Sequence, residues 1–199
     1  GYDAATTEEI ARLAGTSIGS VYQFFPNKLA IFNAIALRYV EKAQALFGTF
    51  VTPSAMLEPW DRLLDRAIDA FAALNAGEPG FRALLLNWRV SADMLIANDD
   101  VNRRFARRAE IVLATQAPSL TPARRALVAT MMIEIISTSL ILCARRRDVD
   151  AAAVLAETKT VLHRYLAPIV SEHGAGAAKS PSKGGKRQRG SAQQRKPVE

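Results

Sequence analysis

Apolar positions recur along the chain with the three-to-four-residue spacing of helices, from the first residues to about residue 171. No stretch alternates apolar and polar residues for long enough to predict a strand. Breaks rich in glycine, proline, asparagine or aspartate separate the apolar stripes at 48–59, 75–79 and 98–99. The pattern therefore predicts an all-α fold made of consecutive helices.

The stretch from Thr7 to Lys28 predicts two short helices joined by a tight turn. Thr7 suits an N-cap, and acidic residues follow it where the helix dipole favours negative charge. Gly15 suits the end of this helix, and Ser17 suits the cap of a second helix that runs to Phe24 or Phe25. We expect three residues of the first helix to face inward: Ile10, Leu13 and Ala14.

The second of these helices has a small and polar outer face, formed by Gly19, Ser20, Tyr22 and Gln23. Pro26 stops the helix and Asn27 suits the cap of the next one. A thin helix with such a face is suited to the major groove of DNA. This part of the chain is therefore predicted to be a helix-turn-helix.

The motif resembles the DNA-binding domain of the tetracycline-repressor (TetR) family of bacterial transcription regulators. The resemblance covers residues 1–47 and is carried by the order Thr-Thr, Ile-Ala, Ala-Gly, Ser, Gly-Ser, Val-Tyr, Phe-Phe and Lys within it. It implies a double-stranded DNA operator as partner. In this family a further helix precedes the pair, so we expect one before Gly1, without which the helix-turn-helix would be only partly covered.

Two groups of residues are expected to contact the operator. The groove-facing group is Ser17, Ile18, Gly19, Ser20 and Gln23. Among them the Gln23 amide suits direct reading of adenine, which presents a paired donor and acceptor. The backbone group is Thr7, Tyr22 and Lys28, whose hydroxyl and ammonium groups would hold phosphates, as the resemblance implies for Tyr22 and Lys28.

The remaining apolar stripes predict helices at 59–74, 80–97 and 100–117, then a long pair at 121–146 and 150–171. Residues 126–144 are apolar enough to suggest a membrane span, but Glu134 near the centre and the hydroxyl residues 137–139 disfavour that interpretation. In the TetR family the last two helices form a four-helix bundle between subunits. We therefore expect a homodimer and no membrane partner.

The middle helices are expected to enclose a cavity for a small-molecule effector, which the sequence does not identify. The candidate lining residues are mostly aromatic or sulfur-containing: Phe71, Phe81, Leu85, Trp88, Met94, Phe105, Met131 and Glu134. For the apolar members, an ordinary core role is the alternative. Glu134 would either be a counter-charge for a cationic ligand, pair with an arginine such as Arg89, or lie at a wet edge.

Charge divides the chain unevenly. The net charge of +7 belongs mainly to residues 174–199, which hold seven Lys and Arg and one acid, while the rest holds 19 basic and 18 acidic residues. We expect three parts: a DNA-binding domain (1–47), a regulatory and dimerisation domain (54–173) and a disordered basic tail that attracts DNA without reading sequence. One cysteine and no secretory signal indicate the cytoplasm.

The function predicted from these features is that of a sequence-specific transcription regulator, a repressor released by its effector. Two alternatives stay open: a nonspecific or architectural DNA-binding protein that relies on its tail, and a helical small-molecule-binding protein or enzyme without DNA binding. No nucleophile–base cluster, phosphate loop or metal-ligand spacing occurs in the sequence. We therefore expect no enzyme activity, no metal and no cofactor.

Overall fold

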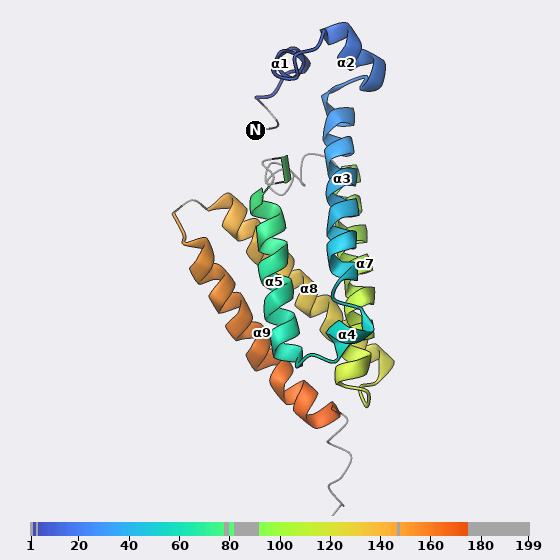
Figure 1. The fold of residues 1–199 in the computed structure, drawn as a ribbon, viewed down its shortest axis with the longest axis vertical. Coiled ribbons are helices and arrows are strands. Elements are labelled where there is room, and N and C mark those ends of the chain that lie inside the picture. The colour runs from blue at the N-terminus through green and yellow to red at the C-terminus, as the bar shows by residue number, and fades with distance from the viewer. Residues whose placement is uncertain (1, 3, 78–79, 82–91, 147, 175–199) are drawn as a thin grey trace, which may run out of the picture.

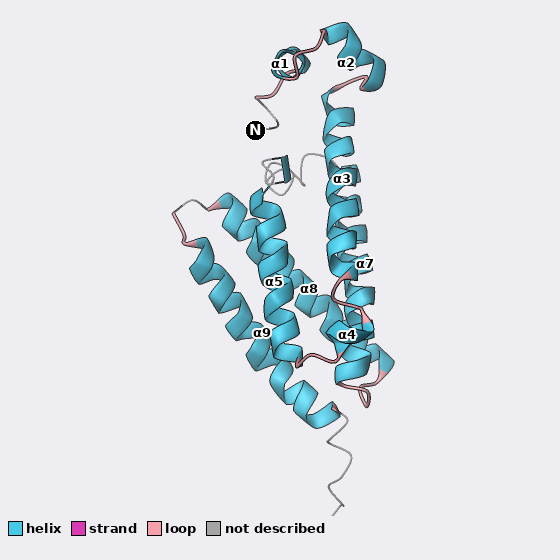
Figure 2. Cartoon of the chain, viewed as in Figure 1, coloured by secondary structure: helices cyan, strands magenta, loops and turns pink. Residues whose placement is uncertain are grey.

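The computed structural model describes residues 2, 4–77, 80–81, 92–146 and 148–174, and every regular element within these ranges is a helix (Figure 2). The all-α prediction is thus confirmed. The helices are, in order, α1 (Thr7–Leu13), α2 (Ile18–Phe24), α3 (Lys28–Gly48), α4 (Pro53–Met56), α5 (Trp60–Gly77), α7 (Ala92–Gln116), α8 (Pro122–Arg145) and α9 (Ala151–His173).

Side-chain caps start α2 and α3 where the sequence predicted them. The caps of α2, α3, α8 and α9 each accept a hydrogen bond from a backbone N–H of the first turn; they are Ser17, Asn27, Thr121 and Asp150. The prediction for α1 was wrong by one residue. Thr6, in extended conformation, accepts from the Glu9 N–H, and Thr7 is the first helical residue.

Two predicted breaks differ from the structure. The expected interruption at 98–99 is absent, because α7 runs without a break from Ala92 to Gln116. Asparagine and aspartate cost a helix interior less than glycine or proline, and packing against α8 offsets that cost. The expected joint at 48–59 contains the short helix α4, which Thr52 caps with Pro53 as the first helical residue. Of the helix predicted at 80–97, residues 82–91 lie outside the described part.

The helix-turn-helix pair α1–α2 stands at one end of α3, and the remaining helices pack around the other end (Figure 1). Helix α3 lies beside α5 and α7, while α8 packs against α7, α9 and α5. Three phenylalanines join these helices. Phe47 of α3 stacks on Phe105 of α7 with ring centroids 5.4 Å apart, and Phe71 of α5 contacts both rings. The last turn of α3 is therefore part of the core.

Two polar clamps hold α7 against the chain segment that follows the helix-turn-helix. The Arg108 guanidinium donates to the Gln44 carbonyl of α3 over 2.8 Å. The Gln116 amide donates to the backbone carbonyls of Met56 and Glu58, at 3.0 and 3.1 Å. The two Gln116 bonds satisfy carbonyls at and just beyond the end of α4, where helical partners run out.

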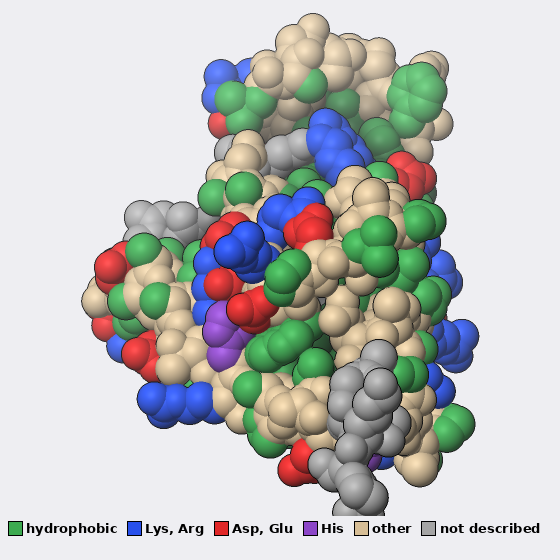
Figure 3. Space-filling model, turned by 60° about the horizontal axis from the view of Figure 1, so that its bottom comes forward, with side chains coloured by type: hydrophobic (Ala, Val, Ile, Leu, Met, Phe, Trp, Pro, Cys, Tyr) green, Lys and Arg blue, Asp and Glu red, His purple; other side chains and the backbone are tan. Residues whose placement is uncertain are grey.

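A ladder of charged side chains joins α5 to α9. Lys159 lies 2.7 Å from the Asp69 carboxylate, and one turn further along, His163 Nε2 lies 2.8 Å from Asp65 Oδ1. On the face shown in Figure 3, acidic, basic and histidine side chains lie next to one another with hydrophobic side chains beside them. The His163 ring also meets Trp60 edge-on at 5.5 Å. The ladder thus lies on the outer side of an aromatic residue of the core.

Replacing Ile68 with alanine should lower the free energy of unfolding by ~2–5 kcal/mol, because its side chain is 1% exposed and no neighbour can fill the space completely. Leu57, which is 86% exposed, is the matched control, and Leu57→Ala should change stability by no more than about 0.5 kcal/mol. Denaturant unfolding at one fixed protein concentration measures both. Equal midpoints for the two variants would contradict this description of the core.

Candidate nucleic-acid interface and ligand cavity

The turn between α1 and α2 depends on Gly15. Its φ of 65° lies in the left-handed region, where a residue with a Cβ is strained. Around it, the Gly15 N–H bonds the Arg12 carbonyl and the Thr16 N–H bonds the Ala11 carbonyl, so the end of α1 is closed before Ser17 begins α2. The role predicted for Gly15 is confirmed.

The contact between α1 and α2 is made by small side chains, with Ala11 and Val21 buried. The prediction that Leu13 faces inward was wrong, since its side chain is 71% exposed. Leu13 follows Ala11 by two residues, which places it about 200° around the helix and therefore on the opposite side. Ala14 is exposed as well, and Ile10 is half-buried.

One face of α2 is open to solvent. Ile18 is 36% and Tyr22 48% exposed, and Gly19 and Gln23 are exposed next to them on the same side of the helix. A Cβ added at Gly19 would meet nothing closer than the Ser17 hydroxyl oxygen at 3.8 Å. The fold therefore does not require glycine at this position, and its lack of a side chain leaves room for a close approach from outside.

The remaining groove candidates, Ser17 and Ser20, bond to each other. Their hydroxyl oxygens lie 2.9 Å apart, and the Ser20 N–H donates to the Ser17 side chain at the helix start. Ser17 is exposed and Ser20 half-buried. The candidate groove-facing residues thus lie together at the N-terminal half of α2 and one turn beyond.

The three candidate phosphate contacts are placed differently. The hydroxyls of Thr7 and Tyr22 lie 3.2 Å apart, which joins the first residue of α1 to the exposed face of α2. Lys28 starts α3, and its ammonium donates to the Tyr2 carbonyl over 2.8 Å and lies 4.4 Å from the centre of the Tyr2 ring. Tyr2 in turn packs edge-on against Phe32 of α3. No pattern in the sequence predicted this contact between Lys28 and Tyr2.

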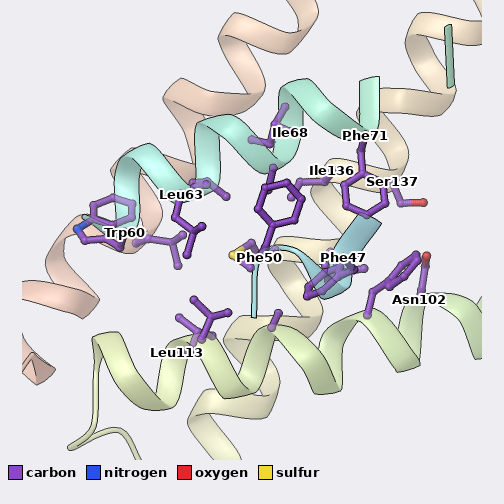
Figure 4. A pocket seen from close by; sticks show the side chains of 18 of the residues that line it. Phe47, Phe50, Trp60, Leu63, Ile68, Phe71, Asn102, Leu113, Ile136 and Ser137 are labelled. Atoms are coloured by element: carbon purple, nitrogen blue, oxygen red, sulfur yellow. The ribbon is translucent and has the colours of Figure 1, made fainter. Parts of the chain in front are cut away.

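A cavity of about 120 Å³ lies among α3, α5, α7, α8 and α9 (Figure 4). Of the residues proposed for it from the sequence, Phe71 and Phe105 line it. Phe81 is buried outside the lining, edge-on against the Tyr39 ring, and Met131 is on the surface with 44% exposure. Three further candidates lie outside the description: Leu85, Trp88 and the side chain of Met94.

Glu134 lies outside the cavity, on the exposed surface of α8, so it is at the wet edge that was one of its expected positions. Its carboxylate accepts a hydrogen bond of 3.1 Å from the Asn102 amide of α7. Together with Arg103 and Arg107, the two residues border a surface groove lined mostly by polar side chains. Asn102 lines both this groove and the cavity, so its side chain stands between them.

The comparisons with known proteins match both parts of the chain. Residues 1–35 match the family model described as bacterial regulatory proteins, tetR family. Residues 59–166, more than half of the chain, match the model described as tetracyclin repressor-like, C-terminal domain. The chain belongs to the TetR family. It is accordingly an all-α, DNA-binding transcription regulator. No curated protein matched the chain.

The cavity of this TetR-family protein is neutral. No charged side chain occurs among its lining residues in the described part of the chain. Burial raises the pKa of the lining Tyr39 phenol, and a hydrogen bond with Asn75 opposes this only in part, so the phenol stays uncharged at neutral pH. The polar groups of the lining were missed by sequence reasoning, although Asn102 and Gln116 interrupt an otherwise apolar stripe of α7 that includes Phe105, Ala109 and Leu113.

Helix α8 has the length and composition that would allow it to cross a membrane, a test that core helices of other proteins also pass. Only 22% of its most apolar 18-residue window is buried within the chain. Leu127 and Met131, one turn apart, are 51% and 44% exposed, and Val161 of the neighbouring α9 is 49% exposed. A single TetR-family chain therefore leaves an apolar surface on its last two helices.

Proposed function

We propose that this TetR-family protein is a repressor that dissociates from its operator when a small molecule binds in the cavity. The observation that carries the proposal is the position of Phe47. Its ring forms part of the cavity wall, and it belongs to the helix that starts at Lys28, directly after α2. Whatever displaces the last turn of α3 therefore also moves the helix that faces DNA.

Helix α3 is long enough to amplify a movement that begins at the cavity. Helix α3 has 21 residues and thus spans about 30 Å, so a small rotation at its cavity end becomes a larger shift at its DNA end. The Phe47–Phe105 stack and the Arg108–Gln44 hydrogen bond hold α3 on α7. A ligand that prefers a wider cavity would shift the population away from this arrangement by as much as its affinities for the two states differ.

Contacts with the operator follow from the exposed face of α2. We assign Gln23 to direct base reading, with Ser17, Ile18, Gly19 and Ser20 beside it in the groove. Thr7 and Tyr22, whose hydroxyls adjoin, would bond one phosphate together. We also propose that Lys28 contacts a phosphate. Its ammonium donates a hydrogen bond to the Tyr2 carbonyl, so the side chain must rotate, or share its donors between the carbonyl and the phosphate, to do so.

Substitutions on α2 separate base reading from phosphate contact. Gln23→Ala should cost ~1–3 kcal/mol on the operator and relax preference at one base pair. Tyr22→Phe should weaken binding to all sequences alike, by ~0.5–1.5 kcal/mol. Fluorescence anisotropy on the operator found by footprinting, and on its single-base variants, measures both. Both side chains are exposed, so circular dichroism should show unchanged helices. Uniform weakening by Gln23→Ala would remove it as the base reader.

We propose that the apolar surface of α8 and α9 pairs with the same surface of a second chain. The exposed side chains of Leu127, Met131 and Val161 are what a self-complementary interface requires, and two-fold pairing is the commonest assembly of soluble proteins. A dimer would present two α2 helices to half-sites about one turn of DNA apart.

Met131→Arg should therefore convert the dimer to a monomer and weaken operator binding about 10²-fold or more, because a single α2 loses the benefit of the second half-site. Leu57→Arg is the matched control: Leu57 is more exposed and directly follows α4, whose main neighbours are α5 and α7, so the dimer should persist. Sedimentation and operator titration at micromolar protein give the two readouts. A Met131→Arg protein that remains dimeric would place the interface elsewhere.

Trp60 offers a test of effector release, because its ring lines the cavity. Compounds that quench its fluorescence should also lower operator affinity, over the same concentration range. In Trp60→Phe the release should persist while the quench is lost, since phenylalanine keeps the apolar wall. Quenching without release would show that the cavity is not connected to DNA binding.

In cells, deleting the gene should raise transcription from the footprinted promoter. Lower transcription after the deletion would identify an activator.

The basic tail, 174–199, enters the proposal as an accessory to DNA binding, and all but its first residue lies outside the described part. Residues 1–47 contain four Lys and Arg against four Asp and Glu, so the DNA-reading end has little electrostatic attraction of its own. Seven basic tail residues would supply this electrostatic attraction without sequence preference. Because the attraction does not depend on sequence, nonspecific DNA binding stays a second candidate function. Chromosomal DNA as the partner places the protein in the cytoplasm.

A further inference from the structure

We propose that the cavity takes an uncharged molecule about the size of one six-membered ring, with a single hydrogen-bonding group directed toward Asn102 and Ser137. The inference rests on the proposed function, because it names the chemical class of the effector that the cavity would hold. Four properties of the cavity carry it: its volume, the absence of charge in its described lining, the arrangement of its aromatic rings and the position of its polar groups.

The volume limits the size of the ligand. Buried ligand sites for drug-sized molecules are roughly 300–1,000 Å³, whereas an apolar cavity of about 150 Å³ accepts benzene. The cavity here measures about 120 Å³. The unbranched side chain of Met132 lies in its wall and can adopt other rotamers, which allows a modest expansion. One ring with one or two substituent atoms therefore fits best, whereas a fused multi-ring compound or a long acyl chain would require a larger rearrangement of the lining.

The lining excludes ionised ligands. Its described residues are apolar or neutral polar, and the nearby acid, Glu134, is directed to the Asn102 amide on the outer side. A carboxylate or ammonium group transferred into this cavity would lose its water without gaining an opposite charge. Tyr39, the ionisable side chain in the lining, stays neutral because of its burial. Neutral molecules are therefore strongly preferred.

The aromatic residues favour a flat ring. Phe47 and Phe105 present parallel faces at an interplanar angle of 9°, and Phe71 approaches Phe105 edge-on at 67°. Trp60 closes the opposite end of the cavity (Figure 4). An aromatic ligand can extend this arrangement by offset stacking or edge-to-face contact, which a saturated chain of equal volume cannot do.

Two polar side chains of the lining, Asn102 and Ser137, lie together at the end away from Trp60 (Figure 4). Asn102 is 8% exposed, and its hydrogen bond to Glu134 holds the amide orientation. The Ser137 hydroxyl has no hydrogen-bond partner among the residues that the structure describes, although it borders the cavity. A hydroxyl on the ligand can donate to one of these groups and accept from the other. A phenol-like molecule thus satisfies both the apolar and the polar end.

Direct binding to the full-length protein tests the inference without reference to DNA. The probes are toluene, phenol, benzoate, benzylamine and naphthalene, measured by calorimetry and ligand-observed NMR at pH 7, where benzoate and benzylamine are charged. Phenol and toluene should bind at least about 100-fold more tightly than the two ions. Binding by benzoate or benzylamine equal to that of phenol would overturn the neutral class. Binding of naphthalene alone, or of no one-ring probe, would overturn the size.

Three variants locate the binding. Ala67→Leu adds side-chain volume at a half-buried position of the wall and should abolish binding of phenol and toluene. Ser137→Ala and Asn102→Leu should each lower the affinity for phenol relative to toluene by about three- to tenfold, the value of one hydrogen bond. Ser139→Ala is the matched control, because the Ser139 hydroxyl donates to the Ile135 carbonyl and does not line the cavity. An unchanged ratio in both polar variants would overturn the assigned orientation.

The outcomes separate this inference from the proposed function. If phenol binds as described but operator affinity stays constant, the ligand class stands and effector-controlled release fails. If a charged or larger compound releases the operator while the one-ring probes do not bind, release stands and the ligand class fails.

Discussion

The stack of Phe47 on Phe105 determines how the two ends of this TetR-family protein are connected. It joins the last turn of α3 to α7, and the edge of Phe71 braces it from α5. Among the described residues, the helix-turn-helix is joined to the remaining helices at the start of α3, so its position depends on how the last turn of α3 is held (Figure 1). The same rings border the cavity. Core packing, the cavity wall and the placement of the helix-turn-helix therefore depend on one aromatic cluster.

Polar groups around the cavity are placed so that charges lie outside it and neutral groups line it. The Asn102 amide donates a hydrogen bond to the Glu134 carboxylate. The negative charge of Glu134 therefore stays on the solvent side, while the neutral amide of Asn102 borders the apolar space. On the other side, the Asp65–His163 pair lies beyond the Trp60 ring. Exposed charges remain solvated and cost little, whereas a charge inside would have to be matched. The cavity can thus be bordered by charged residues while its described lining stays neutral.

Helix α8 illustrates why apolar composition alone is ambiguous. One side packs on α7 and α9 through buried residues such as Val128 and Ile133, and another side exposes Leu127 and Met131. A helix that serves its own core on one side and a partner on the other is apolar nearly all round, as a membrane-spanning helix is. Glu134 and Thr138 are exposed on the outer side, which suits a protein interface with a polar component better than hydrocarbon.

The sequence by itself determined the local structure of this protein. The caps at Ser17 and Asn27 and the left-handed turn at Gly15 could be predicted because each depends on one residue's own side chain and backbone. The motif around them also indicated the family. The set of cavity residues could be predicted only in part: Phe71 and Phe105 were found, because aromatic residues on a helical stripe are usually buried.

Tertiary structure decided the rest, because burial depends on which face of a helix meets a neighbour. The apolar Leu13 is exposed since Ala11 makes the contact with α2, and Glu134 lies outside the cavity while the polar Asn102 borders it. Helix α7 continues through 98–99 because packing on α8 outweighs a weak local preference. No single segment contains this information. It arises only when α3, α5, α7 and α8 are packed together.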